Sequence, residues 1–163
     1  MRNLLIAGLI LAAGAASAQS FKAELAAPWD GENVPSGQQC RLFEGAGATP
    51  PMALTGLPDG TVQIRVEFND KSYPPLAANG GHGVIGFSVS GPNAALPAVP
   101  GMTADLPEGI EVLSAARSSG QYASPGYLPP CSGGRGNRYM ADVIALDASG
   151  AELARVSVEL GRY

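Results

Sequence analysis

Apolar and polar residues alternate strictly along one segment of the chain, residues 62–68. Its apolar members, which would all point to the same side of an extended chain, are Val62, Ile64, Val66 and Phe68. A period of two residues is typical of a β-strand with one face in the core and the other in solvent. Residues 57–60, Leu-Pro-Asp-Gly, directly precede the segment and predict a turn, because proline sets φ and Asp-Gly supports a chain reversal.

Further strands are expected where short apolar or alternating runs lie between glycine- and proline-rich segments. They are predicted at residues 84–89, 110–113, 139–146 and 155–160. Residues 147–150, Asp-Ala-Ser-Gly, predict a turn between the last two strands, and one helical turn is expected at residues 151–154. No segment sustains a helical period. The pattern therefore predicts an all-β protein, mainly β-strand with little helix, whose strands form a β-sandwich of two packed sheets.

One long loop is expected at residues 118–136, which are rich in Ser, Gly, Pro and Tyr. Glycine and proline together supply 36 of the 163 residues, far above their usual share, so long connections are expected throughout. Loops of this length often carry function.

Residues 1–18 have the pattern of a cleaved signal peptide. Arg2 supplies a positive charge, residues 4–13 form an apolar run, and Ala-Ser-Ala at residues 16–18 is a small-residue cleavage motif. The apolar run is too short to span a bilayer. We therefore expect export to the periplasm or the cell exterior, no membrane span, and a single domain at residues 19–163.

The charge balance argues against two classes of partner. The formal net charge is −4, and it becomes −5 without Arg2, the one charged residue among the first eighteen. Nucleic acids and anionic membrane surfaces bind clusters of Lys and Arg, so a mildly acidic protein is poorly suited to either.

Cys40 and Cys131 are the only cysteines of the chain. In the oxidising compartment that the signal peptide predicts, an even number of cysteines favours a disulfide. Two separate buried thiols are the alternative, because sequence spacing alone does not place two cysteines within bonding distance.

His82 is the only histidine, so any chemistry that needs an imidazole must use it. Its neighbours Gly80, Gly81 and Gly83 predict a flexible, accessible turn on which the imidazole would change charge near neutral pH. Two interpretations stay open. In the first, Asp70 orients a functional His82, which donates a hydrogen bond to a phosphate or carboxylate oxygen. In the second, His82 is an exposed loop residue without function.

Other kinds of reactive site are not indicated. Two cysteines and one histidine, widely separated, are too few for a structural zinc site. Residues 86–90, Gly-Phe-Ser-Val-Ser, lack the closing glycine of a nucleophile elbow. The glycine cluster at residues 133–136 does not connect a strand to a helix, as a nucleotide-binding loop would. We expect no cofactor, no metal and no catalytic residue.

Several short segments follow one another along the chain in an order that resembles that of a known protein family. They are Val-Pro-Ser at 34–36 before Cys40, Thr-Pro-Pro-Met-Ala-Leu at 49–54, Gly-Leu-Pro-Asp-Gly-Thr at 56–61, Asn-Asp at 69–70, His82 before the strand at 84–89, Leu-Pro-Glu-Gly at 106–109, Gly-Tyr at 126–127, Pro-Cys at 130–131 and Arg-Tyr at 138–139. In this order they resemble the bacterial, Raf-kinase-inhibitor-like branch of the phosphatidylethanolamine-binding protein (PEBP) family. The resemblance covers residues 34–163 and implies a Greek-key β-sandwich with a small anion-binding pocket at one end.

In that family the pocket is built from an aspartate, two histidines, a Pro-Pro loop backbone and a tyrosine. The ligand-binding residues that the resemblance implies here are Asp70, His82, Pro130, Asn137 and Tyr139. Asn137 stands where the second histidine is expected, which removes a potential positive charge and favours a neutral or zwitterionic ligand. Asn69 is an alternative for the aspartate position, and Asp70 is preferred because it keeps a carboxylate. The chain also lacks the helices that the family usually carries before its C-terminal strand.

Three functions follow from these observations. We expect a binding protein for a small polar or phosphate-bearing ligand. A second hypothesis is an interaction or protease-inhibitor module, in which the loop at residues 118–136 contacts an envelope protein partner. A hydrolase with His82 as its base ranks last, because no nucleophile is matched to that histidine.

Overall fold

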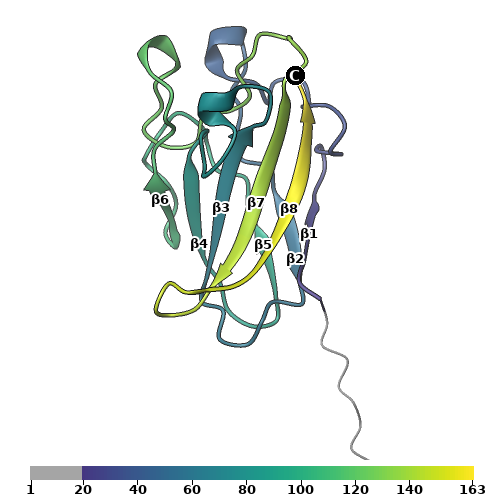
Figure 1. Ribbon diagram of the computed structural model, residues 1–163, viewed down its shortest axis with the longest axis vertical. Coiled ribbons are helices and arrows are strands. Elements are labelled where there is room, and N and C mark those ends of the chain that lie inside the picture. The colour runs from purple at the N-terminus through teal and green to yellow at the C-terminus, as the bar shows by residue number, and fades with distance from the viewer. Residues whose placement is uncertain (1–19) are drawn as a thin grey trace, which may run out of the picture.

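The computed structural model describes residues 20–163, and the predicted signal peptide and Gln19 lie outside these described residues. Two antiparallel sheets face each other (Figure 1). The three-stranded sheet has the order β1-β2-β5, with β1 at Lys22–Leu25, β2 at Met52–Thr55 and β5 at Asn93–Leu96. The five-stranded sheet has the order β6-β4-β3-β7-β8, with β6 at Ile110–Ser114, β4 at Val84–Ser88, β3 at Gln63–Asp70, β7 at Arg138–Leu146 and β8 at Glu152–Arg162. The expected all-β fold is confirmed.

The five-stranded sheet contains all five strands that the residue pattern predicts. Ile64, Val66 and Phe68 of β3 are almost fully buried, as their alternation with polar residues requires. Val62 differs, because it precedes β3 at the end of the sheet and keeps 44% of its surface exposed. The inward face of the strand therefore begins at Ile64.

The helical turn expected at residues 151–154 is wrong, because β8 begins at Glu152 and pairs with β7 from there. The predicted turn at residues 147–150 is confirmed and explains the difference. Asp147 Oδ1 accepts hydrogen bonds from the backbone N–H groups of Ser149 (2.8 Å) and Ala151 (3.0 Å). The chain thus reverses at once and enters a strand, which leaves no room for a helix.

The three-stranded sheet was not predicted. Each of its strands is only four residues long, and β5 has the sequence Asn-Ala-Ala-Leu, which is poor in the β-branched and aromatic residues that strands favour. Packing of its side chains into the core, rather than strand propensity, stabilises this sheet. Met52 and Leu54 of β2 and Leu96 of β5 are buried in the same core as the inward face of the large sheet.

The long loop predicted at residues 118–136 is confirmed, and it is held against the body of the sandwich. Its one regular element is the short 3-10 turn η3 at Gly120–Tyr122. Tyr127 is buried, with its ring 4.5 Å from that of Phe68. A disulfide joins Cys131 of this loop to Cys40, with 5.2 Å between the Cα atoms, so of the two alternatives for the cysteines the structure has the bridge.

The 3-10 turns mark one end of the molecule. Figure 1 shows η3 at that end together with η1 (Arg41–Phe43), η2 (Pro74–Leu76) and the C-terminus. The turn that leads into β3 and the turn between β7 and β8 lie at the opposite end (Figure 1). None of the helices within residues 20–163 is long and apolar enough to cross a membrane.

Candidate functional site

A pocket of about 500 Å³ opens at the end of the sandwich where the 3-10 turns lie. Four of the five expected ligand-binding residues line it: Asp70, His82, Asn137 and Tyr139. They come from the end of β3, the segment before β4, and the start of β7 with the residue before it. Segments that are far apart in the sequence therefore meet in one hollow.

Asp70 is the last residue of β3 and stands opposite Tyr139 of β7 in the strand register. Asp70 is only 4% exposed, and its carboxylate is held from two sides. The Ser72 N–H donates to Oδ1 (2.9 Å), and the Asn137 side-chain amide donates to Oδ2 (2.6 Å). Each carboxylate oxygen keeps a further lone pair, so Asp70 remains a hydrogen-bond acceptor on the pocket wall.

Asn69 points away from this pocket. Its Oδ1 accepts hydrogen bonds from the backbone N–H groups of Gly80 (3.0 Å) and Gly81 (3.3 Å), and its Nδ2 donates to Asp142 Oδ2 (3.2 Å). Neighbouring residues of a strand face opposite sides, so only one of Asn69 and Asp70 can line the pocket. Asn69 instead fixes the segment that leads to His82.

His82 is not on the flexible, accessible turn that its glycine neighbours predict. It is 3% exposed, its N–H donates to Phe68 O (2.8 Å), and its own carbonyl accepts from the Leu128 N–H (2.8 Å). The glycines serve close packing. A Cβ on Gly81 would lie 2.2 Å from the Leu76 carbonyl oxygen.

The imidazole of His82 is fixed in one tautomer. Its Nδ1 lies 2.8 Å from the Leu128 carbonyl oxygen, which can only accept, so Nδ1 carries the proton and Nε2 carries the lone pair. Burial lowers the pKa of His82, while the Leu128 carbonyl and the Asp70 charge act in the opposite direction. The ring is therefore neutral at pH 7. Leu128, rather than Asp70, orients it.

Tyr139 packs edge-on against His82, with ring centroids 5.4 Å apart and an interplanar angle of 80°. Its hydroxyl oxygen accepts a hydrogen bond from the Cys131 N–H (3.2 Å). Burial is the main reason that the pKa of Tyr139 rises to about 12, and the charge of Asp70 acts in the same direction. The phenol is therefore protonated and ties the disulfide loop to the pocket floor.

Pro130, the fifth expected residue, is not part of the pocket lining. It is buried, and its carbonyl accepts a hydrogen bond from the Cys40 N–H (2.9 Å). Its neighbour Cys131 reaches the lining instead. The loop thus contributes to the lining through Cys131, and Pro130 is hydrogen-bonded to the other cysteine of the disulfide.

Sequence reasoning missed the outer part of the pocket. Its lining includes Tyr73, Arg117, Ser118, Ser119, Tyr122, Ser132 and Arg135. Most of these belong to the long loop at residues 118–136. The sequence predicts that loop as a functional segment, but it does not identify these individual residues as part of a pocket. Tyr73 follows Asp70 on the way to η2, and no signal in the sequence marked it.

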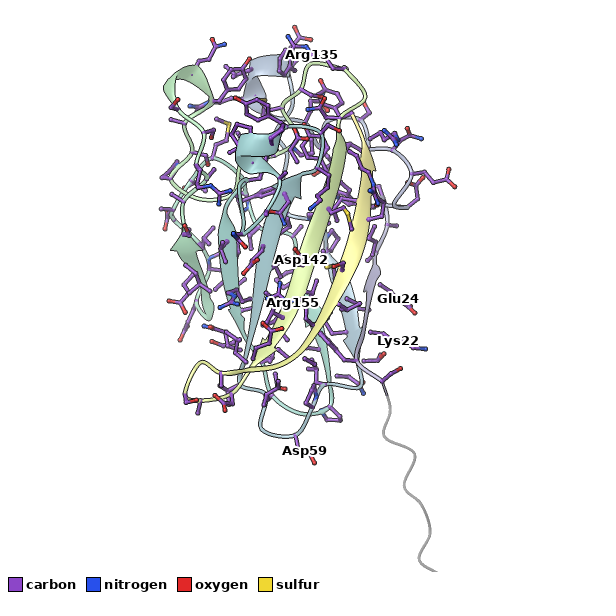
Figure 2. The ribbon with its side chains drawn as sticks, viewed as in Figure 1. Lys22, Glu24, Asp59, Arg135, Asp142 and Arg155 are labelled. Carbon is purple, nitrogen blue, oxygen red and sulfur yellow. A yellow bond between two sulfur atoms is a disulfide. The ribbon has the colours of Figure 1, made fainter. Side chains whose placement is uncertain are left out.

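Two arginines line the pocket, and they differ in their partners. The guanidinium of Arg117 donates to three backbone carbonyls, those of Ala78 (2.7 Å), Asn79 (2.8 Å) and Pro75 (3.2 Å). Arg135 is exposed, and within residues 20–163 its side chain has neither a hydrogen bond nor an ion pair. Figure 2 shows it at the loop end of the molecule, far from Asp59 at the opposite end.

The solved structure of a PEBP homologue from Chlamydia trachomatis is similar to this chain. The two are 20% identical, the match covers 88% of this chain and 97% of that chain, and the TM-score is 0.55. The sequence matches no family model and none of the curated proteins. The structural likeness confirms the PEBP-like fold that the order of the sequence segments implies.

Proposed function

We propose that this chain is an exported binding protein that holds a small polar ligand with a phosphate-type group in the pocket at the loop end of the sandwich. The observation that carries the proposal is the convergence of Asp70, His82, Asn137 and Tyr139 on that pocket. A concave site with a few convergent polar groups is the usual form of a small-molecule site. The PEBP-like fold supports the same class of function.

The polar groups of the pocket keep hydrogen-bond acceptor capacity that the fold itself does not use. Burying a carboxylate is unfavourable unless its hydrogen bonds are made. Asp70 keeps spare acceptor capacity, and His82 Nε2 has no protein partner among residues 20–163. A ligand group that donates hydrogen bonds, such as an ammonium or a hydroxyl, would satisfy both acceptors.

Binding is favoured over hydrolysis by the partners of the nearby hydroxyl groups. Ser132 Oγ donates to the Tyr163 carbonyl oxygen (2.5 Å), and the phenol of Tyr139 is held by Cys131. A nucleophile needs a hydrogen bond to its base. In the described part of the chain, no hydroxyl is hydrogen-bonded to His82 Nε2.

Titration of the isotope-labelled protein with phosphoethanolamine and with inorganic phosphate tests the proposal. With phosphoethanolamine we expect backbone shift changes centred on His82 and Asp70, and a calorimetric signal that Asp70→Asn weakens. Asp59→Asn removes the same charge at the far end of the molecule and should bind like the wild type (Figure 2). Shift changes that avoid the pocket, or none at all, would contradict a ligand site there.

Export is part of the proposal and has its own test. The signal-peptide pattern of residues 1–18 and the Cys40–Cys131 disulfide both fit an oxidising compartment. Mass spectrometry of the protein from a cell-envelope extract should give a chain that starts at Gln19 with its disulfide intact. A full-length, reduced chain found only in the cytosol would contradict export.

A further inference from the structure

The floor of the pocket is poorly suited to an anion. Asp70 brings a negative charge, and the neutral His82 presents a lone pair at Nε2. The Asn137 amide, which could donate to an anion, is already hydrogen-bonded to Asp70 Oδ2 at 2.6 Å. A phosphate placed at the floor would therefore meet acceptors where it needs donors.

Positive charge at the pocket comes from the two arginines, and one of them is committed to the fold. Arg117 donates to the carbonyls of three residues in and just after η2, and so holds the chain between β3 and His82. These bonds use three of the five N–H groups of the guanidinium and hold it against η2, so Arg117 has fewer donors left for a ligand than Arg135. Arg117 is thus a structural cation.

Arg135 is the cation that remains available. It lines the pocket, its side chain is exposed, and within residues 20–163 no acidic group or carbonyl pairs with it. Two other basic side chains near this end have partners. Arg138 pairs with Glu159, and Lys71 Nζ donates to the Ala77 carbonyl (2.7 Å).

The backbone around Arg135 presents it toward solvent and the pocket mouth. Gly133, Gly134 and Gly136 all have positive φ, between 69° and 77°, in the region that favours glycine. A Cβ on Gly133 would lie 2.9 Å from the Phe43 ring, whereas one on Gly134 or Gly136 would have no atom within 4 Å, so the segment rests on Phe43 at its start and then stands clear of the body. Its end is anchored by Arg162 Nη1, which donates to the Gly136 carbonyl (3.2 Å).

We propose that Arg135 binds the anionic group of the ligand at the mouth of the pocket, while the Asp70–His82 floor receives a hydrogen-bond donor of the same ligand. A planar guanidinium matches two oxygens of a phosphate or carboxylate at once, which a lysine does not. The ligand therefore carries its anionic group outward and its donor group inward. This inference rests on the proposed function, because it assigns the orientation of a ligand in that pocket.

Phosphoethanolamine carries both groups and serves as the probe, with Arg135→Ala as the variant. Charge-assisted hydrogen bonds contribute about 1.5–3 kcal/mol, so the dissociation constant should rise by roughly tenfold to a hundredfold. Arg135→Lys should recover only part of the affinity. Arg41→Ala is the matched control, because Arg41 lies in η1 at the same end of the molecule but does not line the pocket.

The outcomes separate this inference from the proposed function. If the wild-type protein binds phosphoethanolamine and Arg135→Ala binds it equally well, the inference is wrong and the binding function stands. If Arg41→Ala weakens binding as much as Arg135→Ala, the effect is one of net charge and the inference is also wrong. A wild-type protein that binds neither phosphoethanolamine nor inorganic phosphate overturns the proposed function and the inference with it.

Discussion

The side-chain amide of Asn137 donates a 2.6 Å hydrogen bond to the carboxylate of Asp70, across 67 residues of sequence. The bond joins the end of β3 to the residue that precedes β7, at the floor of the pocket. It also explains how an asparagine is accommodated where the family resemblance implies a histidine. The amide satisfies the carboxylate without adding charge.

Replacing Asn137 with Ala should therefore destabilise the fold. A hydrogen bond to a charged group contributes about 1.5–3 kcal/mol, and the half-buried position of Asn137 favours the lower end of that range. Urea unfolding measures the change. Asn93→Ala is the control, because its exposed Oδ1 accepts only a long bond (3.3 Å) from the Gly56 N–H and should cost under about 0.5 kcal/mol. Equal losses for the two variants would contradict the role of Asn137.

The stability of the protein should depend on pH through His82. Burial lowers the folded-state pKa of His82 below its ordinary value of 6.5, so the unfolded chain binds more protons between the two values. The free energy of unfolding should thus be constant above pH 6.5 and fall as the pH drops below it. Denaturant unfolding at a series of pH values from about 5 to 8, the range in which histidine titrates, measures this fall in the free energy of unfolding.

His82→Gln provides the control for that dependence. His82 is the only histidine of the chain, so the variant removes the one side chain with an ordinary pKa of 6.5. The decline in stability just below pH 6.5 should disappear with it. A variant that keeps the same decline as the wild type would show that another group titrates there.

The prediction of His82 from the sequence shows where local reasoning ends. The order of the segments correctly placed His82, Asp70 and Tyr139 near one another. Its three glycine neighbours nevertheless suggested flexibility, because nothing local reveals that Leu128 and Leu76 pack against the turn. Contacts made by residues 46 positions away in the sequence are not visible in a short window.

The same limit applies to the two sheets. The strands β3, β7 and β8 have alternating or apolar runs of eight to eleven residues, so their patterns identify them. The strands β2 and β5 have four residues each, and their pairing with each other makes them strands. Arg117 and Arg135 were missed for a related reason, because their roles depend on which carbonyls and which pocket wall lie beside them.

A substitution at Gly81 should test the close packing around His82. A Cβ there would lie 2.2 Å from the Leu76 carbonyl oxygen, a backbone atom that cannot move easily. Gly81→Ala should therefore destabilise by about 2–3 kcal/mol. Gly86→Ala is the matched control, because its Cβ would meet only flexible side chains, those of the exposed Leu113 at 3.1 Å and of Gln63 at 3.2 Å. Thermal unfolding compares them, and equal melting temperatures would show that the turn at Gly81 yields readily.

Loss of the Cys40–Cys131 disulfide should be the largest single change in stability. The bond closes a loop with a sequence separation of 91 residues, for which the chain-entropy treatment gives about 4–5 kcal/mol, while measured values for disulfides are typically about 2–4 kcal/mol. The double variant Cys40→Ser with Cys131→Ser should therefore unfold at a much lower urea concentration than the oxidised wild type. Reduced wild-type protein should match the variant.

The disulfide also bears on the pocket, which gives the double variant a second measurable effect. Cys131 lines the pocket and its N–H holds the Tyr139 hydroxyl at 3.2 Å, while the Cys40 N–H holds the Pro130 carbonyl at 2.9 Å. These backbone bonds remain without the disulfide, so the fold should persist at low urea with a looser wall and weaker binding of phosphoethanolamine. A loss of stability below about 1 kcal/mol with unchanged binding would mean that these bonds alone keep the loop in place, since removal of a disulfide that constrains the unfolded chain costs more than that.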